Sequence, residues 1–115
     1  MNFKELLVWQ KAMDICRSVY RITSGFPAHE IYGMTSQMRR AGVSVAANIS
    51  EGHSRNTKGE YRQFPGIAIG SLSELETLTI LSRDLSLNEN TNWALLLQQE
   101  EELRKMLFSI KPKLS

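Results

Sequence analysis

The chain has 115 residues, which is enough for one domain and one hydrophobic core but not for a second. Hydrophobic residues make up 42% of it and charged residues 23%, a balance that supports a packed globule and argues against a disordered chain. The formal net charge is only +2, which excludes a histone-like polycation, so any nucleic-acid role must depend on locally clustered charge.

The single cysteine, Cys16, excludes an intramolecular disulfide and a cysteine-based zinc site. It lies in an apolar stretch, so we expect a small buried side chain and not a reactive thiolate. No stretch approaches the roughly 18 apolar residues of a transmembrane helix, and the N-terminus lacks the apolar segment of a signal peptide. We therefore expect a cytoplasmic protein that does not associate with membranes.

The first predicted helix covers residues 4–24, and Gly25, expected in a left-handed cap conformation, ends it together with Pro27. Its apolar stripe follows a spacing of three and four residues and consists of Leu6, Trp9, Met13, Cys16, Tyr20 and Thr23, with Ala12 and Val19 widening it. The second predicted helix covers residues 30–54 and starts irregularly near Gly33. Its stripe consists of Met34, Met38, Ala41, Val45 and Ile49. Gly42, among alanines, predicts close approach by a neighbouring helix.

The third predicted helix covers residues 57–85 and starts with a capping-box pattern of Thr57 and Glu60. Pro65 lies two turns inside it, and we expect a kink there because the apolar phase continues unchanged. The predicted core residues of this helix are Tyr61, Phe64, Ala68, Leu72, Leu75 and Leu78.

The fourth predicted helix covers residues 91–110, with Leu96, Leu97, Leu103, Met106, Leu107 and Ile110 toward the core. Glu100, Glu101 and Glu102 are expected mostly on its solvent side. All connections are short, which favours antiparallel neighbours. The sequence thus predicts an all-α protein, an antiparallel up-down-up-down four-helix bundle forming one domain over residues 1–115.

A straight polar row follows the second predicted helix, within about 60° of one direction over five turns. It consists of Gln37, Arg40, Ser44, Asn48, Glu51 and Arg55. Serine and asparagine are weak helix formers, so their place in mid-helix calls for a reason. Either the row flanks the core and bonds to neighbouring helices within the subunit, or it faces a second subunit or a ligand. Both alternatives stay open from the sequence.

A second row on the third predicted helix is expected opposite the core face and consists of Ile69, Ser73, Thr77 and Ile80. Two isoleucines with small hydroxyl residues between them indicate a packing surface beyond the monomer core. We therefore expect a homo-oligomer in which this row is an oligomer face.

Four segments carry a family resemblance, and they span residues 3 to about 85 in order and at matching separations. They are Phe3 to Trp9, Phe26-Pro27 with Glu30 and Gly33, the run from Gln37 to Gly52 followed by Arg55, and the run from Ile67 to Glu76. Together they resemble a bacterial four-helix bundle family related to the proteins encoded in 23S rRNA intervening sequences, often labelled S23 ribosomal proteins. Pro65 departs from the helix-forming apolar residue more common there.

This resemblance implies a non-enzymatic bundle. Relatives of the family include the accessory variability determinants of diversity-generating retroelements, which resemble pentameric barrels with basic surfaces that engage nucleic acid. For this chain the resemblance implies a homopentamer with an RNA- or DNA-associated role and no catalytic activity.

The charge is unevenly distributed along the chain. Residues 1–62 hold nine basic and five acidic side chains, 9 − 5 = +4, and the remainder holds five and seven, 5 − 7 = −2. In a symmetric ring the basic half would form a substantial phosphate-binding surface. The predicted phosphate contacts, without base readout, are Arg17, Arg21, Arg55, Lys58 and Arg62. Arg39 and Arg40 are expected on different sides of their helix.

The sequence leaves one alternative to this hypothesis and argues against an enzyme. The alternative is a protein-interaction scaffold that binds no nucleic acid. An enzyme is disfavoured because no pair of histidines has metal-ligand spacing and no Glu-x-x-His occurs. We expect no cofactor and no metal, and we interpret His29 and His53 as polar residues at helix ends.

Overall fold

The structure is a computed structural model that describes residues 2–54 and 58–110, without the side chains of residues 58–64. Four α-helices follow one another, with bounds α1 Leu7–Thr23, α2 Met34–His53, α3 Lys58–Asp84 and α4 Trp93–Ile110. Two short 3-10 helices, η1 (Phe3–Glu5) and η2 (Ala28–Glu30), precede α1 and α2. The described ranges contain no strand. The all-α prediction is confirmed, including the irregular start of the second helix.

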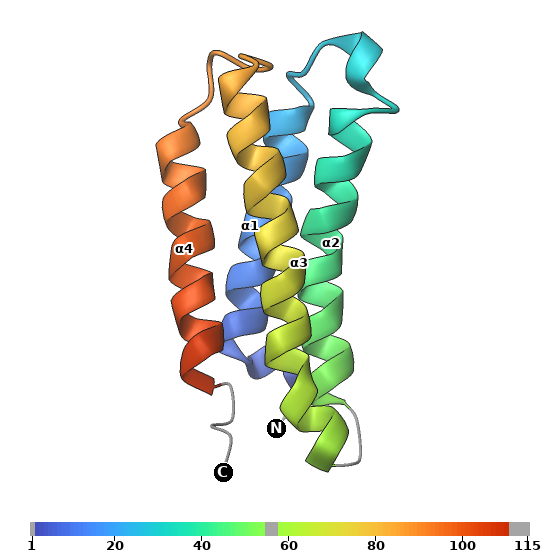
Figure 1. Cartoon of the computed structure of the whole chain (residues 1–115), viewed down its shortest axis with the longest axis vertical. Helices are drawn as coiled ribbons and strands as arrows, with labels where there is room; N and C mark the ends of the chain where they lie inside the picture. Colours follow the sequence, from blue (N-terminus) through green and yellow to red (C-terminus); the bar gives the residue numbers. More distant parts are fainter. Residues whose placement is uncertain (1, 55–57, 111–115) are drawn as a thin grey trace.

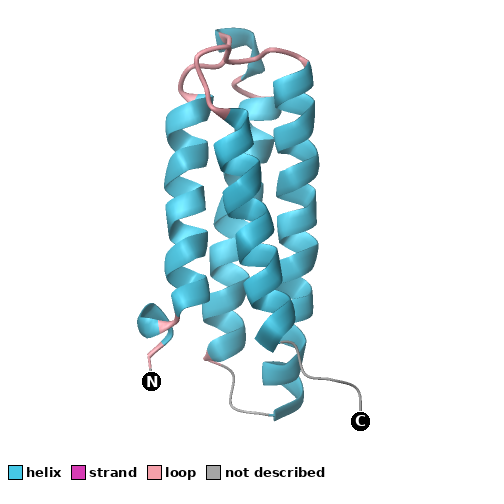
Figure 2. Ribbon diagram, turned by 90° about the vertical axis from the view of Figure 1, so that its left-hand side faces the viewer, coloured by secondary structure: helices cyan, strands magenta, loops and turns pink. Residues whose placement is uncertain are grey.

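The helices form a bundle that measures 45 × 21 × 21 Å. In Figure 1 the sequence colours show α1 and α3 running one way along the long axis and α2 and α4 running back. Figure 2, turned by 90°, shows the four helices side by side along the same axis. None of the described helices is long and apolar enough to cross a membrane.

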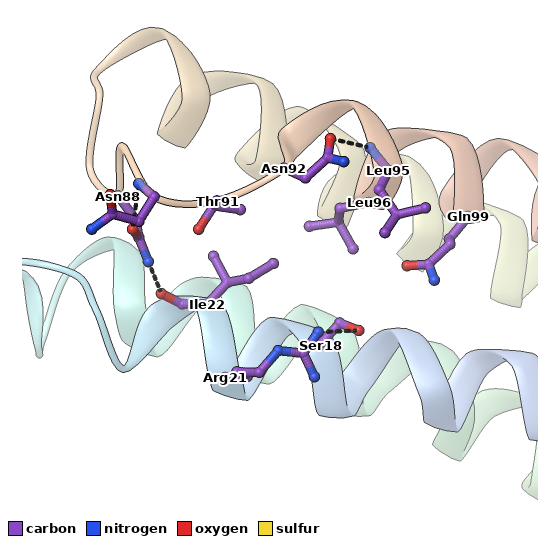
Figure 3. Close-up of a pocket in the computed structure, with 10 residues that line it drawn as sticks. Ser18, Arg21, Ile22, Asn88, Thr91, Asn92, Leu95, Leu96 and Gln99 are labelled. Carbon is purple, nitrogen blue, oxygen red and sulfur yellow. Dashed lines mark hydrogen bonds between the residues drawn. The ribbon is translucent and has the colours of Figure 1, made fainter.

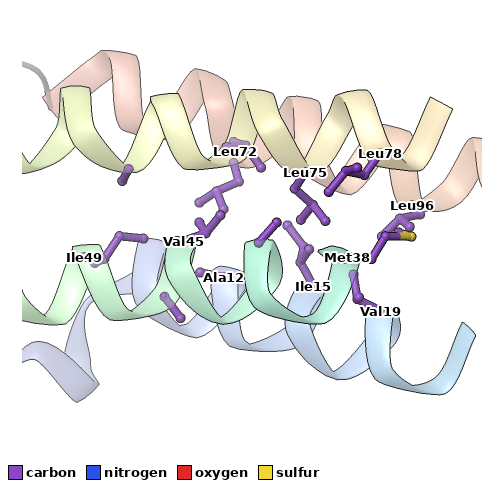
Figure 4. Packing of buried hydrophobic residues seen from close by; sticks show 14 of the residues in the cluster. Ala12, Ile15, Val19, Met38, Val45, Ile49, Leu72, Leu75, Leu78 and Leu96 are labelled. Carbon is purple, nitrogen blue, oxygen red and sulfur yellow. The ribbon is translucent and has the colours of Figure 1, made fainter. Parts of the chain in front are cut away.

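The core runs along the centre of the bundle and receives side chains from all four helices (Figure 4). Its largest side chains, each exposed by 2% or less, are Val19, Met38, Val45, Ile49, Leu72, Leu75, Leu96, Leu103 and Leu107. Burying a leucine, isoleucine or methionine contributes about 1.5–3 kcal/mol, so this column dominates the stability of the fold. The apolar stripe predicted for the second helix is confirmed, with Met34 only partly buried.

The stripe predicted for the first helix is confirmed in part, because Ala12, Cys16, Val19 and Thr23 are buried but its other members are not. The side chains of α1 that enter the core are Val8, Ala12, Ile15, Cys16, Val19, Ile22 and Thr23. Tyr20 is 44% exposed, and Trp9 and Met13 pack only partly against the core. The helix carries two apolar rows about 100° apart, and the core takes the row with the β-branched residues.

Helix α3 runs through Pro65 without ending, as predicted. Proline removes one backbone donor and crowds the preceding turn, and Figure 1 shows α3 bending in its first turns. On α2, Gly42 is buried against α1, where a Cβ at this position would lie 3.6 Å from Cys16 Sγ. The close helix approach predicted around Gly42 is confirmed.

The end of α1 differs from the prediction. No described glycine has a positive φ, so Gly25 is not the left-handed cap residue that the sequence predicted. The N–H groups of Gly25 and Phe26 instead bond the carbonyls of Ile22 and Thr23, at 3.1 and 3.0 Å. Gly25 is needed for another reason, because a Cβ there would lie 2.4 Å from the side chain of Asn88.

The left-handed residue in the described chain is Ser86, with φ of 55°, just after α3. The Leu87 N–H bonds the Ser82 carbonyl at 3.1 Å and the Ser86 N–H bonds the Arg83 carbonyl at 3.0 Å. This is the Schellman pattern, in which the two bonds satisfy carbonyls at the end of a helix. Leu87 packs against the core and directs the chain toward α4.

Candidate nucleic-acid interface

Two of the predicted phosphate contacts, Arg17 and Arg21, lie on the exposed face of α1. Arg17 pairs with Asp14 at 3.0 Å, and 64% of its side chain remains exposed. Arg21 donates to the Ser18 hydroxyl at 3.2 Å. An exposed ion pair within one helix contributes at most about 1 kcal/mol, so Arg17 can exchange its partner for a phosphate at little cost.

Arg21 also lines a hollow of 290 Å³ where α1 meets the connection between α3 and α4 (Figure 3). The other polar side chains around it are Ser18, Asn88, Asn90, Thr91, Asn92 and Gln99. Several of these hold the fold together. Asn88 donates to the Ile22 carbonyl at 2.9 Å, and Asn92 accepts from the Leu95 N–H at 3.0 Å as the cap of α4. The positive charge of this hollow therefore comes from Arg21, which forms no ion pair with the described residues and lies among neutral amide and hydroxyl side chains.

The remaining three predicted phosphate contacts cannot be placed with these two. Arg55 lies outside the described residues, as does Thr57 of the predicted capping box. Lys58 and Arg62 belong to the first turns of α3, where the description covers the backbone only.

The polar row on α2 divides into two parts. Ser44 and Asn48 are half-buried and contact α3, where the Asn48 amide donates to Ser71 Oγ at 2.9 Å and to Ser44 Oγ at 3.2 Å. The two serine hydroxyls lie 3.2 Å apart. These three side chains tie α2 to α3. The middle of the row therefore bonds a neighbouring helix within the subunit, which is the first of the two alternatives that the sequence left open. Gln37, Arg40 and Glu51 are exposed.

The row on α3 does not lie opposite the core as a unit. Ile69 is half-buried and packs against the core, while Ile80 is 39% exposed. Ser73 accepts from Arg104 of α4 at 3.1 Å, and Thr77 donates to the Ser73 carbonyl at 2.9 Å. The four residues lie about 60° to 140° around the helix from Leu72, so they form a flank toward α4. The prediction of an opposite face is wrong for Ile69.

Arg39 and Arg40 line one common hollow with Tyr20 and Tyr32, at the end of the bundle that holds the connection between α1 and α2. The sequence predicted that the two arginines lie on different sides of their helix. Their directions do differ, since Arg39 bonds the end of α1 and Arg40 also borders a space lined by Glu74 of α3. Both side chains still border the first hollow because Ile31 and Tyr32 of the connection close it. Ile31-Tyr32, two large side chains in a connection, was the signal available in the sequence.

Glu100 is fully buried between α3 and α4, whereas the sequence predicted it mostly on the solvent side with Glu101 and Glu102. Thr79 Oγ1 lies 2.7 Å from Glu100 Oε2 and 2.9 Å from the Leu75 carbonyl oxygen. Because a hydroxyl has one hydrogen, both bonds form fully when a protonated Glu100 donates to Thr79 and Thr79 donates to Leu75.

The surroundings of Glu100 favour its protonated form. Burial raises the pKa of Glu100 to about 8, and the nearby Glu76 carboxylate also raises the pKa. Two groups lower the pKa: the Thr79 hydroxyl, which can donate to the ionised carboxylate, and the positive charge of Arg104. Arg104 forms an ion pair with Glu76 and lies 3.5 Å from Glu101. Within the described chain, Glu100 Oε1 has no hydrogen-bond partner. The carboxyl is enclosed in the core, so it is a structural group and not one that reaches a substrate.

Other candidate chemical groups have ordinary structural positions. Cys16 is buried, and burial raises the pKa of its thiol while Arg17 acts against the rise. His29 lies in η2, 3.8 Å from Glu30, and His53 is the last residue of α2. Among the described residues, no group of three or more histidine, cysteine or carboxylate side chains could hold a metal ion.

Fold and surface together define an antiparallel four-helix bundle with exposed arginines on α1, at the start of α2 and near the end of α3. The family model described as 23S rRNA-intervening sequence protein matches residues 4–109. This chain belongs to that family, which confirms the resemblance found in the sequence.

The solved structures agree at the level of the fold. The crystal structure of a protein of unknown function from the S23 ribosomal protein family of Bacteroides thetaiotaomicron VPI-5482 superposes with a TM-score of 0.81. The two chains are 21% identical over 93% of this chain and 100% of the other. None of the curated proteins matches the chain significantly.

Proposed function

We propose that this protein is a non-enzymatic homo-oligomer, a ring-like pentamer, that associates with the backbone of RNA or DNA through basic surfaces. The membership of a family named for a 23S rRNA intervening sequence supports a connection with RNA. The phosphate contacts in this proposal are those predicted above, of which Arg17 and Arg21 are the described pair on α1.

The observation that carries the proposal is an excess of exposed arginine on α1 and the first half of α2. Arg17, Arg21 and Arg40 are exposed there, and Asp14, the partner of Arg17, is the one exposed carboxylate beside them among the described residues of that part. On α4 the exposed Glu101 and Glu102 are accompanied by the exposed Lys105. Repetition of a basic surface around a ring would place many positive charges along one nucleic-acid strand, and released counterions would drive binding.

Exposed apolar side chains support the oligomer. Large ones that are 39–59% exposed occur on all four helices and include Leu7, Val43, Ile67, Ile80, Leu95 and Phe108. Scattered single residues of this kind are normal, but so many on so small a bundle favour contacts with further copies.

The test is a salt titration of binding to structured RNA and to duplex DNA, with light scattering to count subunits. We expect an oligomer and an affinity that falls linearly on a log–log plot as salt rises. The double variant Arg17→Ala, Arg21→Ala should lower that slope by about two, and Lys105→Ala on α4 should leave it unchanged. Absence of binding at low ionic strength, or binding that ignores salt, would contradict the proposal.

The alternative, a protein-interaction scaffold, also has an observation in its favour. A hollow of 300 Å³ between α1 and α2 is lined almost entirely by apolar atoms, from Phe3, Trp9, Met13, Val43 and Ala47 among others. Phe3 packs edge-on to Trp9 with ring centroids 5.3 Å apart, which holds both rings at its rim. Recovery of one defined protein from the native host after nuclease treatment, with no nucleic-acid affinity, would favour the scaffold.

A further inference from the structure

The hollow bordered by Tyr20, Tyr32, Arg39 and Arg40, here called the tyrosine–arginine hollow, has a volume of 570 Å³. The side chain of Tyr32 is almost fully in solvent, with 95% exposed, and Tyr20 is 44% exposed. A tyrosine that stands free of its own fold contributes nothing to the core. Its flat apolar face is therefore available to a ligand.

The two arginines of the hollow differ in how they are held. The Arg39 guanidinium stacks over the Tyr20 ring, 4.7 Å from the centroid, and its Nε donates to Thr23 Oγ1 at 2.9 Å. A further nitrogen donates to Ser24 Oγ at 3.3 Å. Arg39 is thus fixed by bonds from α2 to the end of α1. Because Arg39 is already held in place, its side chain loses less conformational entropy when a ligand binds.

Arg40 makes no hydrogen bond or ion pair with the described residues, and its side chain is exposed. It borders the tyrosine–arginine hollow and also an adjoining one, and Tyr32, Ser36 and Ser44 line both. No acidic residue lines the first hollow, and Glu74 of α3 lines the second. Two arginines and several hydroxyl-bearing residues therefore line the same hollow as Tyr32.

An aromatic face beside guanidinium groups is the combination that single strands require. Each base offers a π-face that stacks on a tyrosine, and each phosphate accepts hydrogen bonds from arginine. In a duplex the bases are already stacked on one another, so an isolated tyrosine has nothing to stack on. The hollow thus suits an unpaired nucleotide better than a duplex.

We propose that the tyrosine–arginine hollow binds a single-stranded segment of nucleic acid, with a base stacked on Tyr32 and the flanking phosphates held by Arg40 and Arg39. The inference rests on the proposed association with nucleic acid. It adds the place of binding, a preference for single strands over duplexes, and a stacking contact between a base and Tyr32. The surface around Arg17 and Arg21 binds the phosphates of the strand, and the hollow selects unpaired nucleotides.

The experiment measures fluorescence anisotropy of four labelled probes of equal length: an oligothymidylate, an oligouridylate, an abasic strand and a duplex. Tyr32→Ala should weaken binding of the two strands that carry bases by about 10-fold or more, and Tyr32→Phe should bind them as the parent does. The abasic strand and the duplex should bind Tyr32→Ala and the parent equally. Arg40→Ala should weaken all single strands and lower their salt slope by about one.

One matched variant controls for general effects. Arg83→Ala removes another exposed arginine, paired with Asp84 at 3.0 Å. It should bind every probe as the parent does. Light scattering on each variant checks that the subunit number is unchanged.

Each other outcome overturns the inference in a distinguishable way. If Tyr32→Ala and Arg40→Ala bind single strands as tightly as the parent, while binding still falls with salt, the hollow is not the site and the proposed function stands. If no probe binds, both proposals fail. If Tyr32→Ala dissociates the oligomer and Arg40→Ala binds normally, the hollow belongs to a second copy of the chain.

Discussion

The buried carboxyl of Glu100 makes the stability of the bundle depend on pH, and Glu100→Gln isolates that dependence. The substitution keeps the size of the side chain and a donor for Thr79 Oγ1 but removes the ionisable group. The folded state raises the pKa of Glu100 from its ordinary 4.5 to about 8. Because the folded pKa is the higher one, the folded protein binds a proton that the unfolded chain releases between these values.

The size of the pH effect on the free energy of unfolding follows from the difference between the unfolded and the folded pKa of Glu100. Stability is fully present below pH 4.5 and is lost as pH rises toward 8, by about 1.4 kcal/mol per pH unit. Over the whole window the loss is on the order of 5 kcal/mol, comparable to the total stability of a small domain. Glu100→Gln should show no such slope. It leaves one amide N–H unpaired, which costs about 1–3 kcal/mol, so the parent should be the more stable near pH 5 and the variant above about pH 7.

The assay is urea denaturation followed by circular dichroism, from about pH 5 to about pH 9 at one fixed protein concentration, since oligomers unfold in a concentration-dependent way. Glu101→Gln is the matched control, because the neighbouring carboxyl is 52% exposed and should change the slope little. A difference in unfolding free energy between parent and Glu100→Gln that stays constant across this range would refute the reasoning.

Three further substitutions test the local structure by the same denaturation assay. Ser86→Gly should stabilise the fold by about 1 kcal/mol, because glycine adopts the left-handed conformation without the penalty of a Cβ; a loss of stability would contradict the Schellman assignment. Gly70→Ala should stabilise α3 by about 0.8–1 kcal/mol, since a Cβ there meets nothing within 4 Å, and a fall in subunit number on light scattering would instead place Gly70 against another copy. Gly25→Ala should destabilise by about 1 kcal/mol because it displaces Asn88, and it should have no such effect in an Asn88→Ala background.

The fold was readable from the sequence because every helix carries a periodic apolar stripe and every connection is short. On α2, α3 and α4 most of the predicted stripe is buried or half-buried where it is described, with Leu72 and Leu75 as clear examples, although Ile110 at the end of α4 is 46% exposed. On α1 only part of the predicted stripe is buried, because that helix has two apolar rows and only the packing of four helices decides which one is enclosed. The conformation of Gly25 was missed because glycine can serve close approach as well as a left-handed turn.

The candidate site was less accessible to sequence reasoning. Glu100 belongs to the series Leu96, Glu100, Leu103, Leu107, whose spacing places the carboxyl on the core side, but two further glutamates directly after it suggested solvent. The meeting of Tyr32 with Arg40 depends on how the connection after α1 folds over α2. Periodicity within one helix carries no information about that meeting.

The hydrogen bond between Glu100 and Thr79 also restricts which alignment of α3 and α4 the sequence accepts. Leucines such as Leu72 and Leu103 are nearly interchangeable partners, and a slide of one turn, about 5.4 Å, would bring other leucines into similar packing. The carboxyl has no such substitute, because after a slide it would face apolar side chains without Thr79. One polar pair in a leucine-rich interface thus excludes misaligned bundles, at a cost in stability that grows as the solution becomes alkaline.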